Sequence, residues 1–126
     1  MANFFLVPRG IEKIVNYVKG KYHNKPVYIL ENGYSPPRQQ DVQVQELLND
    51  VKRVEFHKAY LASMARAIRD GADVRGYFVW ALMDNYEWVE GYSLMFGLHY
   101  VDRQTLKRIP KLSSEGSFGC QITSRG

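Results

Sequence analysis

The sequence predicts an α/β protein with parallel strands, and two observations favour this class. Two short, continuous apolar runs, residues 27–30 and 76–81, are typical of strands that are buried on both faces of a parallel sheet. Each run follows a segment with apolar residues at helical spacing, which gives the order helix, strand, helix, strand. The 126 residues are 45% hydrophobic and 13% aromatic, which suits one folded domain.

The first helix is expected over residues 9–22, directly after Pro8. Apolar residues recur along it at spacings of three and four, while lysines and a glutamate take the opposite face. The segment 23–26 breaks this helix, and the strand at 27–30 follows. The strand ends abruptly at Glu31-Asn32-Gly33, and residues 34–45, which contain two prolines, are expected to form a loop.

A second, longer helix is expected over residues 46–70. Its apolar face includes Leu61 and Met64, and we expect Arg53 and His57 on its surface. Gly71 lies just past its end, where a left-handed C-cap favours glycine. The second strand, an aromatic and acidic stretch at 82–96 and a short extended segment at 96–102 follow.

Composition and charge exclude several classes of protein. The net charge is +4, but the 17 Lys and Arg residues are scattered and no nucleic-acid-binding motif is visible, so we predict no nucleic-acid partner. No apolar stretch approaches the ~20 residues that span a membrane, and no secretory signal is visible. The single cysteine indicates no compartment, and the three histidines have no partner at metal-ligand spacing, so we predict neither metal nor cofactor.

Two candidate site segments lie where the strands end. In parallel α/β barrels, catalytic groups project from the C-terminal ends of strands, and both Glu31 and the stretch that begins at Trp80 occupy such ends. Each also has a structural explanation. Glu-Asn-Gly is a common turn, Trp80 could belong to the core, and Glu87 could be a solvated loop charge.

Three motifs in order carry a family resemblance. Residues 28–33 read Tyr-Ile-Leu-Glu-Asn-Gly, residues 71–92 contain the Trp80 and Glu87 segment, and residues 96–102 read Phe-Gly-Leu-His-Tyr-Val-Asp. Together they resemble glycoside hydrolase family 1, the β-glucosidases, plant myrosinases and relatives, in a plant-like form. The resemblance implies the C-terminal portion, about strands 7 and 8 with flanking helices, of a (β/α)8 TIM barrel. We expect residues 1–112 to be a partial barrel and residues 113–126 a divergent, disordered tail.

The resemblance also implies roles for five residues. Glu31 matches the nucleophile, and Trp80 matches the indole platform under the sugar. Glu87 matches the carboxylate that accepts the 4- and 6-hydroxyls, and Trp88 matches a tryptophan whose N–H reaches the 3-hydroxyl. Phe96 matches an aromatic side chain beside the hydroxymethyl group of the sugar. Apolar sugar faces stack well on indole, and hydroxyl groups favour charged acceptors, so the chemistry is consistent.

The sequence departs from the family pattern in four places. Leu30 and Ala81 replace a threonine and a serine, and both changes remove a hydroxyl near the site. Residues 108–111 match the start of the final helix, but the aromatic-rich helix expected next is replaced by a Gly- and Ser-rich segment. The Asn-Glu-Pro motif, which carries the acid/base carboxyl in this family, does not occur in these 126 residues. Retaining glycosidases need that second carboxyl ~5–5.5 Å from the nucleophile.

The resemblance therefore implies a retaining O-glycosyl hydrolase that acts on β-D-glucosides, with this chain inactive on its own. An alternative is a non-catalytic fragment that associates with a full-length relative or binds sugar weakly. Relatives are often secreted, vacuolar or in the endoplasmic reticulum, but nothing in this sequence indicates the compartment.

Overall fold

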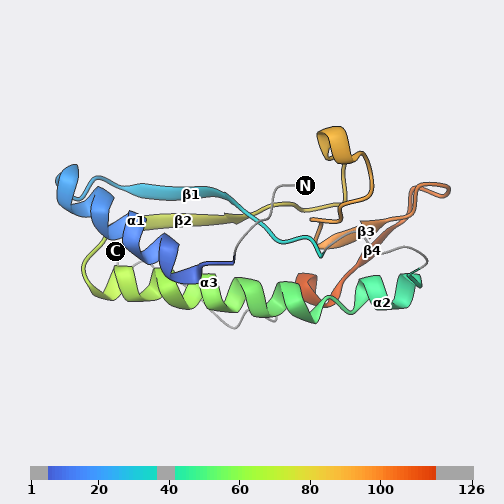
Figure 1. Ribbon diagram of the computed structural model, residues 1–126, viewed down its shortest axis with the longest axis horizontal. Helices are drawn as coiled ribbons and strands as arrows, with labels where there is room; N and C mark the ends of the chain where they lie inside the picture. The colour runs from blue at the N-terminus through green and yellow to red at the C-terminus, as the bar shows by residue number, and fades with distance from the viewer. Residues whose placement is uncertain (1–5, 37–41, 116–126) are drawn as a thin grey trace.

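The computed structural model describes residues 6–36 and 42–115. The chain begins with α1 (Pro8–Lys21), β1 (Val27–Asn32), α2 (Val44–Leu48), α3 (Val51–Arg69) and β2 (Val74–Val79). Shorter elements follow: the 3-10 helix η1 (Trp88–Glu90), the strands β3 (His99–Val101) and β4 (Arg108–Pro110), and the 3-10 helix η2 (Leu112–Glu115). Figure 1 shows α3 running beneath β1 and β2, with β3, β4 and α2 toward the other end.

The predicted order of helix, strand, helix and strand is confirmed. β1 and β2 pair in parallel, with Val27 opposite Val74 and Asn32 opposite Val79. α1 begins at Pro8, whose fixed φ and missing N–H suit the first turn of a helix. Gly71 has a φ of +92°, the left-handed conformation predicted for it after the second long helix.

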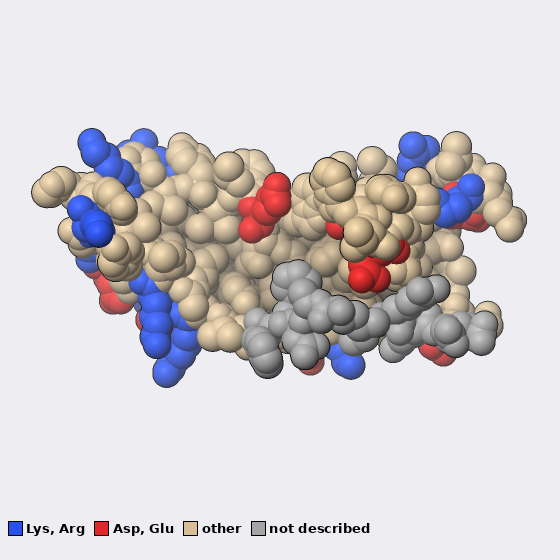
Figure 2. Space-filling model, turned by 45° about the horizontal axis from the view of Figure 1, so that its top comes forward, with Lys and Arg blue, Asp and Glu red and all other residues tan. Residues whose placement is uncertain are grey.

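Helices cover one face of the β1–β2 sheet, not both. Val15 of α1 and Ala67 of α3 pack with Ala72, and Val27, Ile29 and Val74 lie against this cluster. The side chains that point away from the helices, Tyr28, Leu30 and Phe78, are 52%, 70% and 54% exposed. The expectation of burial on both faces is therefore wrong for this chain, because nothing within the described residues covers the second face. Figure 2 shows a largely uncharged surface between the two ends of the molecule, with Lys and Arg visible at both ends and a few Asp and Glu between them.

The second predicted helix is divided. α2 ends at Leu48 and α3 begins at Val51, so the single helix expected over 46–70 is interrupted at Asn49 and Asp50. The side chain of Asp50 accepts hydrogen bonds from the backbone N–H of Ser113 at 2.8 Å and its hydroxyl at 2.6 Å. Part of the loop expected over 34–45, residues 37–41, lies outside the described residues.

The segment expected to begin the final helix is a strand. Residues 108–110 form β4, which pairs antiparallel with β3, Tyr100 lying opposite Ile109. The carboxylate of Asp102 accepts the backbone N–H groups of Gln104 and Thr105 and so stabilises the turn between the two strands. The local hairpin therefore satisfies the backbone groups that a helix would have paired within itself.

The expected C-terminal tail begins in a packed segment. Residues 112–115 form η2, and Ser113 is fully buried against α3. Residues 116–126 of the expected tail lie outside the described residues.

Candidate active site

The C-terminal ends of β1 and β2 lie side by side. The backbone N–H of Trp80 donates to the carbonyl of Asn32 at 2.9 Å, one residue beyond the paired strands. Parallel pairing therefore brings the residues after both strands to one edge of the sheet, as expected for this fold class. Glu31 and Trp80, the residues predicted as nucleophile and sugar platform, lie at this edge, and Glu31 is exposed.

Gly33 lies against the backbone of the neighbouring strand end. A Cβ at this position would lie 2.1 Å from the carbonyl oxygen of Trp80 and 3.0 Å from its carbonyl carbon. Any side chain larger than hydrogen would push the two strand ends apart. Glycine is therefore required at position 33 because the Trp80 backbone lies so close. Its backbone conformation does not require glycine, since Gly33 is not among the glycines with positive φ.

A partly buried hydrogen-bond chain connects Asn32 to α3. The amide Nδ2 of Asn32 donates to the hydroxyl of Tyr77 at 3.0 Å, and that hydroxyl lies 2.9 Å from Nδ1 of His57. Burial raises the pKa of Tyr77 to about 12. Burial, aided by the positive charge of Arg53, lowers the pKa of His57 to about 4. Near pH 7 the tyrosine is therefore protonated and the imidazole is neutral. Asn32, the residue after Glu31, is thus held by a chain of uncharged groups.

The structure also brings Trp80 and Glu87 together. The indole Nε1–H of Trp80 donates to Oε1 of Glu87, seven positions further along the chain, at 3.3 Å. Glu87 is partly buried, and its backbone N–H donates to the carbonyl of Gly91 at 2.7 Å, which closes the loop around η1. A carboxylate at the N–H edge of an indole leaves the indole face free, and this arrangement suits a hydroxyl-bearing ring with apolar C–H faces.

Phe96 and Trp88 differ in how they are held. The carbonyl of Phe96 accepts the backbone N–H of Ala81 at 3.1 Å, and Leu98 donates to Ala81 at 2.8 Å, so the Phe96 segment is joined to the end of β2. Trp88 starts η1 with a φ of +47° and is 82% exposed. The structure therefore places Phe96 beside the candidate site, while the side chain of Trp88 lies in solvent.

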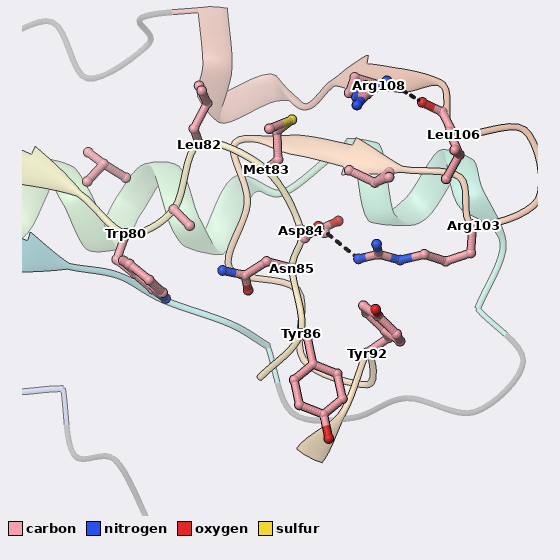
Figure 3. Close-up of a pocket in the computed structure, with 13 residues that line it drawn as sticks. Trp80, Leu82, Met83, Asp84, Asn85, Tyr86, Tyr92, Arg103, Leu106 and Arg108 are labelled. Carbon is pink, nitrogen blue, oxygen red and sulfur yellow. Dashed lines mark hydrogen bonds between the residues drawn. The ribbon is translucent and has the colours of Figure 1, made fainter. Parts of the chain in front are cut away.

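An open pocket of about 600 Å³ lies next to this edge. Trp80 lines it, but Glu31, Glu87, Trp88 and Phe96 do not. Figure 3 shows Arg103 reaching into the pocket, where its guanidinium donates to the carbonyl of Asp84 at 2.8 Å and lies 4.0 Å from the centre of the Tyr92 ring. Trp80 is therefore the single candidate site residue that the strand ends share with this pocket.

Four buried polar residues support the site, and the sequence reasoning missed them. Arg53 and His57, expected on the helix surface, are 1% and 0% exposed, so that expectation is wrong. Asp84 and Lys111 form a buried ion pair of 2.8 Å. The signal was present for the first two, because Arg53 and His57 continue the stripe of Leu61 and Met64 at spacings of four, four and three.

Among the described residues, no group of three or more His, Cys, Asp or Glu side chains could hold a metal ion. In the same part of the chain, no helix has the length and apolar character needed to cross a membrane.

The sequence matches known proteins along most of its length. The profile of glycosyl hydrolase family 1 matches residues 1–118. The chain is 53% identical over 110 residues to "Probable inactive beta-glucosidase 14" of Oryza sativa, covering 87% of this chain and 21% of that protein. It is 50% identical over 116 residues to "Coniferin beta-glucosidase" of Pinus contorta, covering 91% of this chain and 23% of that protein. The chain thus spans less than a quarter of these two relatives.

Solved structures show the same relation. A rice β-glucosidase, solved also as a mutant in a covalent complex with Glc, matches with a TM-score of 0.88 and 43% identity over 98% of this chain and 26% of that chain. β-Glucosidase 2 of Trichoderma reesei, in complex with Tris, matches with a TM-score of 0.86 and 35% identity over 91% of this chain and 25% of that chain. These neighbours are (β/α)8 barrels, so the chain has the fold of part of such a barrel.

Proposed function

The chain belongs to glycosyl hydrolase family 1, and from that premise we propose that it supplies the nucleophile side of a retaining β-glucosidase site. Glu31 is the nucleophile, and Trp80, Glu87, Trp88 and Phe96 bind the sugar. β1 and β2 are then strands 7 and 8 of the barrel, with α1, α2 and α3 as flanking helices. The order of the three motifs along the chain supports this assignment, as does the parallel pairing of the two strands.

One observation carries the proposal. The backbone hydrogen bond from Trp80 to the Asn32 carbonyl joins the two strand ends that carry Glu31 and Trp80, which supports a shared site at this edge of the sheet. The bond from the Trp80 indole to Glu87 adds support for Glu87 as a member of the same site. In a retaining glycosidase, a carboxylate attacks the anomeric carbon and forms a covalent glycosyl-enzyme, which water then hydrolyses. Glu31 performs the attack, while Trp80 stacks on the sugar and Glu87 accepts its hydroxyls.

The proposed substrate is a β-D-glucoside. Glu87, as the acceptor of the 4- and 6-hydroxyls, sets the orientation of the sugar, and the stacked indole excludes water from one face of it. Leu30 and Ala81 supply no hydroxyl near these groups, in contrast to the threonine and serine of the family pattern.

The acid that protonates the leaving group must come from residues beyond these 126. An inverting or retaining enzyme needs two carboxyl groups, one on each side of the scissile bond. The 126 residues contain no Asn-Glu-Pro, so we propose that the chain on its own does not hydrolyse glucosides. The division into a barrel part, 1–112, and a tail, 113–126, stays a prediction.

A chimera tests this proposal. The chain replaces the matching quarter of the unmutated rice β-glucosidase, so that the rice enzyme supplies the remaining strands and the second carboxyl. We expect the chimera to hydrolyse an aryl β-glucoside, Glu31→Gln to lower kcat by at least about a thousandfold, and the isolated chain to be inactive. An active isolated chain, or a chimera whose activity survives Glu31→Gln, contradicts the proposal.

A second candidate is association with a full-length relative, without catalysis. The exposed outer face of the β1–β2 sheet favours it, because contiguous apolar patches of this kind mark interaction surfaces. Mixing the chain with the rice enzyme and measuring sedimentation distinguishes the two candidates. A complex that leaves the activity of the rice enzyme unchanged, and that Leu30→Lys abolishes, supports association. Independent sedimentation at all concentrations contradicts it.

A further inference from the structure

Arg53 is the most completely buried cation of the described chain and lies on the first turn of α3. Its Nε donates to the carbonyl of Tyr34 at 2.9 Å, and its Nη1 donates to the carbonyl of Gly97 at 2.7 Å. Its Nη2 donates to the carbonyl of Met95. One guanidinium therefore holds three carbonyls on two different loops, which its planar fork of five N–H groups permits.

The charge of Arg53 is neutralised locally. Nη1 forms an ion pair of 2.5 Å with Asp50, whose side chain is 8% exposed. Burial lowers the pKa of Arg53, and the neighbouring carboxylates of Asp50 and Asp84 oppose that change. Because guanidinium stays protonated in proteins, the buried cation depends on these partners and on its three carbonyls.

The two loops held by Arg53 belong to the candidate site. Tyr34 lies three residues after Glu31, and Met95 and Gly97 flank Phe96. The same loops make one further contact, from the backbone N–H of Met95 to the hydroxyl of Ser35 at 2.9 Å. We propose that Arg53 is a positioning residue, which fixes the Phe96 segment relative to the strand end that carries Glu31.

The chemical roles of Glu31 and Phe96 rest on the proposed function, but the positioning itself does not. The geometry of the fork is the basis of the positioning, since a lysine supplies the charge as a single point and cannot reach three separated carbonyls. A purely structural role would require only a buried cation opposite Asp50. Arg53→Lys therefore distinguishes the two roles: it disrupts positioning, which needs the guanidinium, but it preserves a role that needs only a positive charge.

Hydrogen exchange of the full 126-residue chain, measured by mass spectrometry in dilute solution, tests the proposal. With Arg53→Lys we expect amide exchange in residues 93–98 to accelerate about tenfold, because local opening of that segment becomes easier. Residues 27–32 and 74–79, which form β1 and β2, keep their protection. Arg53→Met, which removes the positive charge as well as the guanidinium, is expected to accelerate amide exchange in the same segment.

Arg66→Lys is the matched control. Arg66 lies on the same helix, where it pairs with Glu12 at 2.9 Å and donates to Ser63, and it touches neither loop. We expect this variant to leave exchange in residues 93–98 unchanged. If Arg53→Met does not fold, Arg53→Lys decides alone. Wild-type exchange in Arg53→Lys overturns the proposal, and so does a uniform acceleration that includes β1 and β2, since that indicates general loss of stability.

The same substitution in the chimera separates this inference from the proposed function. We expect Arg53→Lys to raise KM for the aryl glucoside more than it lowers kcat, because the misplaced Phe96 segment contacts the sugar rather than the reacting bond. If Arg53→Lys accelerates exchange only in residues 93–98 of the chain but the chimera is inactive, the positioning by Arg53 holds and the proposed function is contradicted. An active chimera whose KM and kcat are unaffected by Arg53→Lys would contradict the positioning.

Discussion

Gly33 shows how a single residue determines the geometry of the strand ends. Its missing side chain allows the carbonyl of Trp80 to approach to a distance that no Cβ tolerates. The neighbouring atom is backbone, which cannot rotate away as a flexible side chain could. The Glu-Asn-Gly motif thus combines a candidate nucleophile with the residue that lets the second strand end lie beside it.

Gly33→Ala is therefore expected to be strongly destabilising, by about 2 kcal/mol or more. Urea unfolding followed by tryptophan fluorescence measures the change. Gly20→Ala in α1 is the control, because its Cβ would meet no atom within 4 Å, and alanine there should stabilise the helix by about 0.5–1 kcal/mol. Equal stability of Gly33→Ala and the wild type would show that the strand ends are not in contact.

His57 predicts how stability depends on pH. Its pKa is about 4 in the folded chain and about 6.5 when unfolded, so the unfolded chain binds more protons between these values. The stability from the neutral, buried imidazole is fully present above pH 6.5 and is lost as the pH falls toward 4. The loss approaches about 3 kcal/mol at pH 4.

His57→Gln removes this titration. We expect the difference in unfolding free energy between the wild type and the variant to shrink as the pH falls from 7 to 4.5, since only the wild type pays for protonation. Urea titrations at the two pH values check this. A difference that stays constant with pH would mean that the imidazole does not titrate with a lowered pKa.

At the scale of elements, the sequence predicted the helices and strands that have clear periodicity and missed the parts that depend on distant contacts. α1, β1, β2 and the glycine after α3 follow from local spacing and turn chemistry. The expectation that residues 108–111 begin a helix was wrong, because residues 108–110 form β4. The pairing of β4 with β3 depends on a hairpin that the family resemblance did not indicate. The expectation that Arg53 lies on the helix surface was also wrong, although its spacing to Leu61 and Met64 indicated the buried stripe. Its hydrogen-bond acceptors could not be predicted, because they are backbone carbonyls 19 and 44 residues away in sequence.

Lys111 and Asp84 connect the hairpin to the loop after β2. Lys111 donates to Asp84 at 2.8 Å, while the backbone N–H of Gly97 donates to the same carboxylate oxygen at 2.8 Å. Lys111→Met leaves a buried carboxylate without its cation, and we expect a loss of about 3–5 kcal/mol. The double variant with Asp84→Asn should recover part of this loss, which a double-mutant cycle of urea unfolding measures.

Lys107→Met is the control for this cycle, because Lys107 is exposed and its change should stay within about 0.5 kcal/mol. If Lys111→Met is as mild as Lys107→Met, the ion pair does not hold the hairpin.

For the whole molecule, the sequence predicted the family and an α/β arrangement of parallel strands, and the profile match and the structure confirm both. The roles of Glu31, Trp80, Glu87, Trp88 and Phe96 stay predictions, because a role depends on a bound sugar and on a second carboxyl. The uncovered sheet face could not be predicted from periodicity, since a run of apolar residues is the same whether one or two layers cover it.

Covalent trapping tests the central claim most directly. A 2-deoxy-2-fluoroglucoside with a good leaving group, added to the chimera, forms a long-lived glycosyl-enzyme on the nucleophile. We predict one fluoroglucosyl group per chimera, on the peptide that contains Glu31, and no label in Glu31→Gln. A label on any other carboxylate, Glu87 included, or turnover by the chimera without a label on Glu31, would contradict the account.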